Sequence, residues 1–119
     1  MSYVDGFLIA IKKKNLKAYK AMAALGCKIW REHGALDYKE CIIDDAQPQY
    51  VTLTFPKLVK TKPGETVWFS FIVFKSRQHR DSVNKKVMAY FEKKYGNEMP
   101  MPFDMKRFSY GGFKVEVSA

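Results

Sequence analysis

Six side chains in this sequence combine a functional group with a position that predicts contact with the protein interior. They are Asp5, Trp30, His33, Trp68, Ser70 and Arg107. Asp5 alternates with Tyr3 and Phe7 along an apolar segment, so its carboxylate needs a buried partner such as Arg107. A buried acid beside a cavity is typical of an acid–base or anion-binding site, and structural ion pairs produce the same pattern. Both interpretations remain open for Asp5.

The aromatic candidates predict the walls of a small-molecule cavity. Trp68 and Ser70 lie in one apolar segment, and Trp30 and His33 lie near the end of a predicted helix, where they could line the cavity mouth. The Met- and Pro-rich loop at residues 99–103 could cover that mouth as a lid. Packing is the simpler role for each of these side chains.

The sequence lacks the residue patterns of metal binding, nucleophilic catalysis and nucleotide binding. His33 and His79 lie on different predicted helices, with no HxxE or HExxH spacing. Asp44 and Asp45 are consecutive in a predicted strand, so their carboxylates point to opposite faces. The sequence has no nucleophile elbow, Walker loop or dinucleotide-binding glycine pattern. We therefore expect no metal site and no cofactor.

Composition and length predict one globular domain over residues 1–119. The chain is 47% hydrophobic and 15% aromatic, outside the range of disordered proteins. No run approaches the roughly 20 apolar residues of a membrane span, so we expect no membrane partner. The start, MSYVDGF, does not resemble a signal peptide, and Cys27 and Cys41 have no CxxC spacing. These features predict a cytoplasmic protein with free thiols.

The net charge of +9, from 21 Lys and Arg against 12 acidic residues, allows two interpretations. Most of the basic residues fall on the polar sides of the two predicted helices, where lysine commonly serves solubility. A basic surface also suits nucleic acid. Residues 69–74 fit the end of the RNP1 motif of RNA-recognition domains, but Val67 and Trp68 replace its basic residue and glycine. RNA binding is therefore the alternative function.

The segment Thr66–Phe74, TVWFSFIVF, predicts a strand that is apolar on both sides. Successive side chains point to opposite faces of a sheet, and Ser70 is the one polar residue after Thr66. A sheet covered on one face alone alternates apolar and polar side chains. Tyr3–Lys12 repeats the doubly apolar pattern. A second subunit, a ligand or a nucleic acid must therefore cover the second face.

The remaining periodicity predicts the order β-α-β, then β-α-β. The predicted elements are strands at residues 3–12, 36–45, 66–74 and 106–117, and helices at residues 16–33 and 77–95. Asn15 and Ser76 are the expected N-caps, and Gly34 and Gly96 the expected stops. The connection at residues 47–63 could hold a short strand or an arm that crosses to a partner. Gly111-Gly112 predicts a bulge or a close backbone approach.

This order is that of a ferredoxin-like βαββαβ fold, an α+β architecture with an antiparallel sheet and both helices on one face. Its first and third strands lie in the middle of the sheet, and these are the two strands that are apolar on both sides. Two such sheets packed face to face form a dimeric α/β barrel with an isologous interface. The sequence therefore predicts a homodimer through the open sheet face.

The chain also resembles the YbaA-like family of small bacterial proteins of unknown function in the dimeric α/β-barrel superfamily. The segments that carry the resemblance are 3–7, Trp30, Glu32, 34–38, Glu40, 44–45, 62–63, 65–67, 69–70, Ser76, 80–81, Asn84, 87–88, 102–104, 106–107 and 110–113. The resemblance implies the fold and the homodimer, and it carries no established activity. The superfamily includes monooxygenases, isomerases and binding proteins that hold a ligand between sheet and helices. Two functions stay open: a homodimer with a small-molecule cavity, as a binding protein or a cofactor-free enzyme, and a nucleic-acid binding module.

Overall fold

The computed structural model describes residues 2–96, 98 and 101–119. Within them the chain forms β1 (Tyr3–Lys12), the 3₁₀ turn η1 (Lys13–Asn15), α1 (Leu16–Glu32), β2 (Asp37–Ile42), α2 (Phe55–Leu58), β3 (Glu65–Phe74), α3 (Arg77–Tyr95), the 3₁₀ turn η2 (Met105–Arg107) and β4 (Ser109–Lys114). Of the helices in this part of the chain, none is long and apolar enough to cross a membrane.

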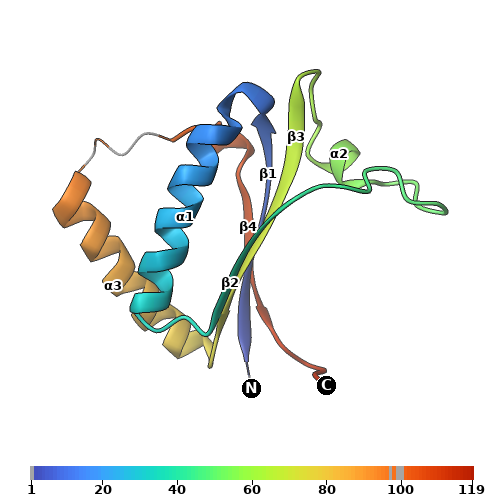
Figure 1. Ribbon diagram of the computed structural model, residues 1–119. Coiled ribbons are helices and arrows are strands. Elements are labelled where there is room, and N and C mark those ends of the chain that lie inside the picture. Colours follow the sequence, from blue (N-terminus) through green and yellow to red (C-terminus); the bar gives the residue numbers. More distant parts are fainter. Residues whose placement is uncertain (1, 97, 99–100) are drawn as a thin grey trace.

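The strands form one antiparallel sheet in the order β2-β3-β1-β4, with α1 and α3 on the same face (Figure 1). The first and third strands therefore occupy the centre, as predicted. In this order β3 separates β1 from β2, and β1 separates β3 from β4, so each βαβ unit has a strand of the other unit between its own two strands. The ferredoxin-like α+β fold is confirmed.

The two faces of the sheet differ sharply in burial. On the helix-covered face, Trp68 is 4% exposed and Phe74 is fully buried. Their neighbours on β3 point to the opposite face, where the side chain of Phe69 is 43% exposed. Phe113 lies on that same open face, paired opposite Val4, and is 61% exposed. An apolar sheet face is therefore left partly uncovered in the single chain.

The arm at residues 43–63 covers one end of the open face. It leaves the sheet after β2, carries α2, and lies on the side opposite to α1 and α3 (Figure 1). Ala10 and Val67 lie on the open face at this end and are only 4% and 2% exposed. The predicted short strand is replaced by α2, which begins with Phe55-Pro56 because proline suits a first helical turn.

Three details of the predicted elements are wrong. The helix begins at Leu16 as expected, but Asn15 does not cap it, because Asn15 already lies in η1 and lacks the extended backbone of a cap. The second strand is shorter, Asp37–Ile42. The last strand begins only at Ser109, because the Asp104 side chain accepts a hydrogen bond from the Lys106 N–H and holds η2 as a turn.

Gly111 and Gly112 lie in a continuous ladder with β1, so the predicted bulge is wrong and the predicted close approach is right. A Cβ atom at Gly112 would clash with the hydroxyl oxygen and the ring of Tyr3. Glycine at this position leaves room for the Tyr3 ring against β4. Ser76, in contrast, caps α3 as predicted, because its Oγ accepts from the His79 N–H at 3.0 Å.

Candidate functional site

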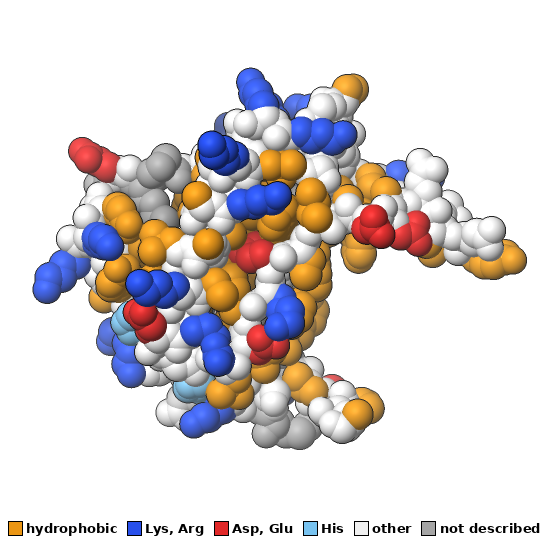
Figure 2. Space-filling view, in the orientation of Figure 1, with side chains coloured by type: hydrophobic (Ala, Val, Ile, Leu, Met, Phe, Trp, Pro, Cys, Tyr) orange, Lys and Arg blue, Asp and Glu red, His pale blue; other side chains and the backbone are white. Residues whose placement is uncertain are grey.

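A cavity of about 230 Å³ lies between the two long helices and the sheet. Its walls are almost entirely apolar and aromatic. They are formed by Phe7, Tyr19, Met22, Ala23, Gly26, Trp30, Tyr38, Glu40, Ser70, Ile72, Met88, Phe91, Met101, Phe103 and Phe108. Met88 and Met101 are 53% and 50% exposed and mark the rim. On the face shown in Figure 2, hydrophobic side chains surround a hollow between α1 and the sheet edge, with Lys and Arg side chains around them.

Glu40 supplies the carboxylate of this cavity and accepts three hydrogen bonds. Its Oε1 accepts from the Tyr19 hydroxyl at 3.0 Å and from the Trp68 Nε1–H at 2.6 Å. Its Oε2 accepts from the Tyr38 hydroxyl at 2.6 Å. We call these four residues the Glu40 cluster. Donors from α1, β2 and β3 thus converge on a single carboxylate.

Local structure explains this convergence. Glu40 pairs with Ser70 across the β2–β3 ladder, and Tyr38 pairs with Ile72, so alternation turns all four toward the helices. Gly26 of α1 faces them, and a Cβ there would lie 3.0 Å from the Tyr38 hydroxyl oxygen. The absence of a side chain at position 26 lets that hydroxyl reach Glu40.

The electrostatics keep the tyrosines neutral. Burial and then the negative charge of Glu40 raise the pKa values of Tyr19 and Tyr38 well above their ordinary value of 10.0. Both hydroxyls therefore remain proton donors to Glu40 at any physiological pH. The cluster is a fixed acceptor site at the edge of an apolar cavity, able to orient a ligand or to receive a proton from one.

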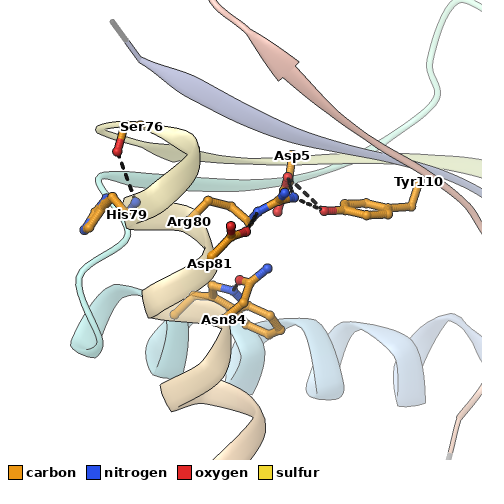
Figure 3. A network of polar contacts seen from close by, with 8 residues as sticks. Asp5, Ser76, His79, Arg80, Asp81, Asn84 and Tyr110 are labelled. Carbon is orange, nitrogen blue, oxygen red and sulfur yellow. Dashed lines mark hydrogen bonds and ion pairs between the residues drawn. The ribbon is translucent and has the colours of Figure 1, made fainter.

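A second polar network joins β1, α3 and β4 (Figure 3). Asp5 is 1% exposed, and its Oδ1 accepts from an Arg80 guanidinium N–H at 2.8 Å and from the Tyr110 hydroxyl at 3.0 Å. Arg80 also contacts the Tyr110 hydroxyl, and its Nε–H donates to Asp81 at 2.7 Å. The guanidinium lies over the ring of Tyr3. We call this the Asp5 network.

Burial raises the pKa of Asp5 above 3.8, against the lowering effect of the Tyr110 hydrogen bond and the Arg80 charge. Burial and the charge of Asp5 likewise raise the pKa of Tyr110 to about 12. The predicted Asp5–Arg107 pair is wrong. Arg107 lies in η2 rather than on the strand beside Asp5, and Arg80 reaches Asp5 from α3 instead.

Arg107 anchors the arm to the sheet. Its guanidinium donates to both carboxylate oxygens of Glu65, at 2.6 and 2.9 Å, and to the carbonyls of Val59 and Lys60, at 3.3 and 3.0 Å. These bonds tie η2, the arm and the start of β3 together. The arrangement is that of a structural clamp.

We expect Arg107→Met to lower the free energy of unfolding by about 1–2 kcal/mol at neutral pH. The hydrogen bonds from Arg107 lower the pKa of Glu65 from 4.5 to about 2. The ionised carboxylate therefore stabilises the folded protein above pH 4.5, and this contribution is lost as the pH falls through the folded value. Urea unfolding between neutral pH and pH 2 should show the difference from the wild type shrinking below pH 4.5. Arg107→Met made in a Glu65→Gln background, where no carboxyl remains to titrate at position 65, should lack this pH dependence; a constant difference for Arg107→Met against the wild type would contradict the assignment.

The structure brings only part of the predicted site together. Trp30 and Ser70 line the cavity. Trp68 does not line it but donates a hydrogen bond to Glu40, which does. The Trp30 Nε1–H donates to Asn84 Oδ1 at 2.9 Å. Asn84 lies on α3, the helix that also carries Arg80 of the Asp5 network. His33 ends α1 with its Nδ1 2.8 Å from the Ile29 carbonyl oxygen and does not line the cavity. Asp5, His33 and Arg107 therefore lie in three separate places.

The predicted lid lies only partly within the described residues. Met101 and Phe103 line the cavity, whereas Met99 and Pro100 fall outside the described part of the chain. Among the residues that the structure describes, no three His, Cys, Asp or Glu side chains gather as metal ligands would.

Glu40 and Arg80, which form these two polar clusters, are not among the six residues that the sequence predicts for the site, although the sequence carries a signal for both. Glu40 alternates with Tyr38 and Ile42, which predicts one shared inner face rather than the exposed polarity of an edge strand. Arg80 precedes Val83 by one helical turn and shares its inward stripe with Val87. These periods place Glu40 on one face of β2 with Tyr38 and Arg80 on one stripe of α3 with Val83; the packing of the two elements turns both groups inward.

Comparisons with known proteins give the family of the chain and support its fold. Residues 2–105 match the family described as "Protein of unknown function (DUF1428)". The chain is 41% identical over 114 residues to the uncharacterized protein YbaA of Escherichia coli K12, covering 96% of each chain, and it matches YbaA of Shigella flexneri equally well. A crystal structure of a dimeric ferredoxin-like protein from an uncultured marine organism aligns over 100% of both chains with a TM-score of 0.55 at 14% identity, which supports the fold alone. The resemblance to YbaA-like proteins is thereby confirmed, and the chain belongs to the DUF1428 family of proteins of unknown function.

Proposed function

We propose that this protein is a cytoplasmic homodimer in which each subunit, a single domain, binds a small organic molecule in the cavity beside Glu40. It would act as a binding protein or as a cofactor-free enzyme. The observation that carries the proposal is an apolar cavity with one carboxylate held by three donors. The two free cysteines, Cys27 and Cys41, fit a reducing compartment.

The size of the cavity limits the ligand. A dry, apolar cavity of roughly 150 Å³ in another protein accepts benzene, and sites for drug-sized molecules begin near about 300 Å³. At about 230 Å³ this cavity suits a single ring with a short substituent, or an aliphatic molecule of similar bulk. The methionines at the rim, Met88 and Met101, have flexible side chains that can adapt to such a ligand.

The polarity of the cavity favours binding with a defined orientation. Burying the apolar body of a ligand against aromatic walls supplies affinity, and a single polar group supplies direction. Glu40 is that group, fixed by Tyr19, Tyr38 and Trp68 before any ligand arrives. If the protein is an enzyme, Glu40 is also the side chain placed to take a proton from the bound molecule.

The open sheet face supports the homodimer. Phe69 and Phe71 lie in contact there, with ring centroids 5.9 Å apart, beside the exposed Phe113. The arm projects beyond the sheet on that side (Figures 1 and 2), and among its apolar residues Tyr50 and Leu53 are exposed. The ferredoxin-like neighbour of similar fold is described as dimeric. A second copy packed on this face would bury the aromatic rings and give the arm a surface to contact.

A substitution that fills the cavity with a larger side chain tests whether ligands bind there. We expect single-ring aromatic compounds to raise the melting temperature of the wild type by several degrees, because a ligand at a hundred times its Kd adds about 2.7 kcal/mol. Ala23→Phe should abolish that rise, because Ala23 lines the cavity and is 6% exposed. Ala24→Phe adds the same ring one residue along, on the exposed side of α1, and should leave the rise intact. Equal responses of the two variants would refute the cavity as the binding site.

A further inference from the structure

In the Glu40 cluster the side-chain donors are all used in hydrogen bonds to Glu40, whereas acceptor positions remain free. The hydroxyls of Tyr19 and Tyr38 and the indole N–H of Trp68 all donate to Glu40. A carboxylate offers about four acceptor positions and each hydroxyl oxygen two, so unused lone pairs remain on Glu40 and on both tyrosines. Among the described side chains that line the cavity, only the Ser70 hydroxyl can still donate. A ligand that meets this cluster must therefore bring hydrogen-bond donors.

The charge of Glu40 is also unbalanced. The lining contains no Lys, Arg or His among the described residues. The ion pairs found in the described part of the chain involve other carboxylates, those of Asp5, Asp37, Glu65 and Asp81. Partly buried charges are normally paired, because an unpaired charge away from water is costly. A cationic ligand would supply the missing positive charge.

The walls of the cavity suit a cation as well. Aromatic rings from both layers face the space: Phe7, Trp30, Tyr38, Phe91, Phe103 and Phe108. The negative faces of aromatic rings attract ammonium groups, and several rings around one carboxylate form a site of this kind. Acidic ligands would meet acceptors and a like charge, and the site opposes them.

We infer that the cavity binds a small protonated amine, with its ammonium group donating to the Glu40 cluster and its apolar body among the aromatic walls. This inference rests on the proposed function and names its ligand class. Ammonium supplies up to three donors and one positive charge, which match the free acceptors and the unpaired carboxylate. A neutral alcohol of equal size matches the acceptors alone.

Calorimetric titration with three isosteric probes tests the inference: benzylamine, benzyl alcohol and benzoate, all at neutral pH. Benzylamine should bind the wild type at least about tenfold more tightly than benzyl alcohol, and benzoate should not bind detectably. Glu40→Gln retains an acceptor oxygen for the cluster but removes the charge, so it should reduce the preference for benzylamine to within about threefold. Glu92→Gln removes the same charge from an exposed site on α3 and should change nothing.

The outcomes separate the ligand class from the cavity itself. If benzyl alcohol or benzoate binds as tightly as benzylamine, or if Glu40→Gln keeps the full preference, the amine inference is overturned and the cavity function stands. If none of the three probes binds to the wild type, the cavity function fails as well.

Discussion

Replacing Asp5 with alanine is expected to lower the free energy of unfolding by about 3–5 kcal/mol. The Asp5 side chain is 1% exposed and its partner Arg80 only 12% exposed, so the change removes the buried carboxylate and leaves the guanidinium paired with the exposed Asp81. The Tyr110 hydroxyl loses its acceptor at the same time. A domain of this size has about 5–15 kcal/mol of stability in total. The loss is therefore a large fraction of the total, and the variant should unfold at a clearly lower urea concentration than the wild type.

A matched double variant separates the charge from the packing. Arg80→Met combined with Asp5→Ala removes both charges and keeps an apolar chain of similar length, so much of the lost stability should return. Urea unfolding at neutral pH, followed by tryptophan fluorescence, gives both values. If Asp5→Ala costs less than about 1 kcal/mol, or if the double variant is no more stable than Asp5→Ala, the ion pair between Asp5 and Arg80 does not stabilise the fold in the way argued here.

Substituting lysine for Phe69 is expected to raise the dissociation constant of the proposed dimer at least about a hundredfold. In an isologous interface the change enters twice, and two like charges brought together in a desolvated patch cost several kcal/mol. Phe69 is 43% exposed in the single chain, so the subunit itself should remain folded. Ala24→Lys adds the same charge on the exposed side of α1 and should leave association unchanged. Analytical ultracentrifugation measures both, and equal dissociation constants would place the interface elsewhere.

The fold could be predicted from the sequence because it depends on local periodicity. The doubly apolar strands at Tyr3–Lys12 and Glu65–Phe74 and the two long helices each carry their own pattern, and their order admits few topologies. The capping of α3 by Ser76 is equally local. What failed was also local. The turn η1 contains Asn15, the expected cap, and η2 contains the residues expected to begin the last strand, because short polar segments support a turn as readily as a cap or a strand end.

The candidate site could be predicted only in part, because its contacts join distant elements. Trp30 and Ser70 were placed in the cavity by their position on apolar faces. The partner of Asp5 depends on the rotation of α3 over the sheet, which brings Arg80 rather than Arg107 to the carboxylate. The position of Glu40 in the cavity depends on which face of the edge strand β2 turns toward the helices. Neither the rotation of α3 nor the facing of β2 is determined by the residues of that element alone.

The mass of the wild-type protein in solution is the measurement that tests the homodimer most directly, by light scattering after size exclusion at low and at high salt. An apolar sheet-face interface predicts a particle near twice the chain mass of 13.8 kDa at both salt concentrations, because burial of aromatic rings is not weakened by salt. A particle of 13.8 kDa at both would contradict the account. It would leave Phe69 and Phe113 free on a basic protein, and nucleic-acid binding with a steep salt dependence would then be the better proposal.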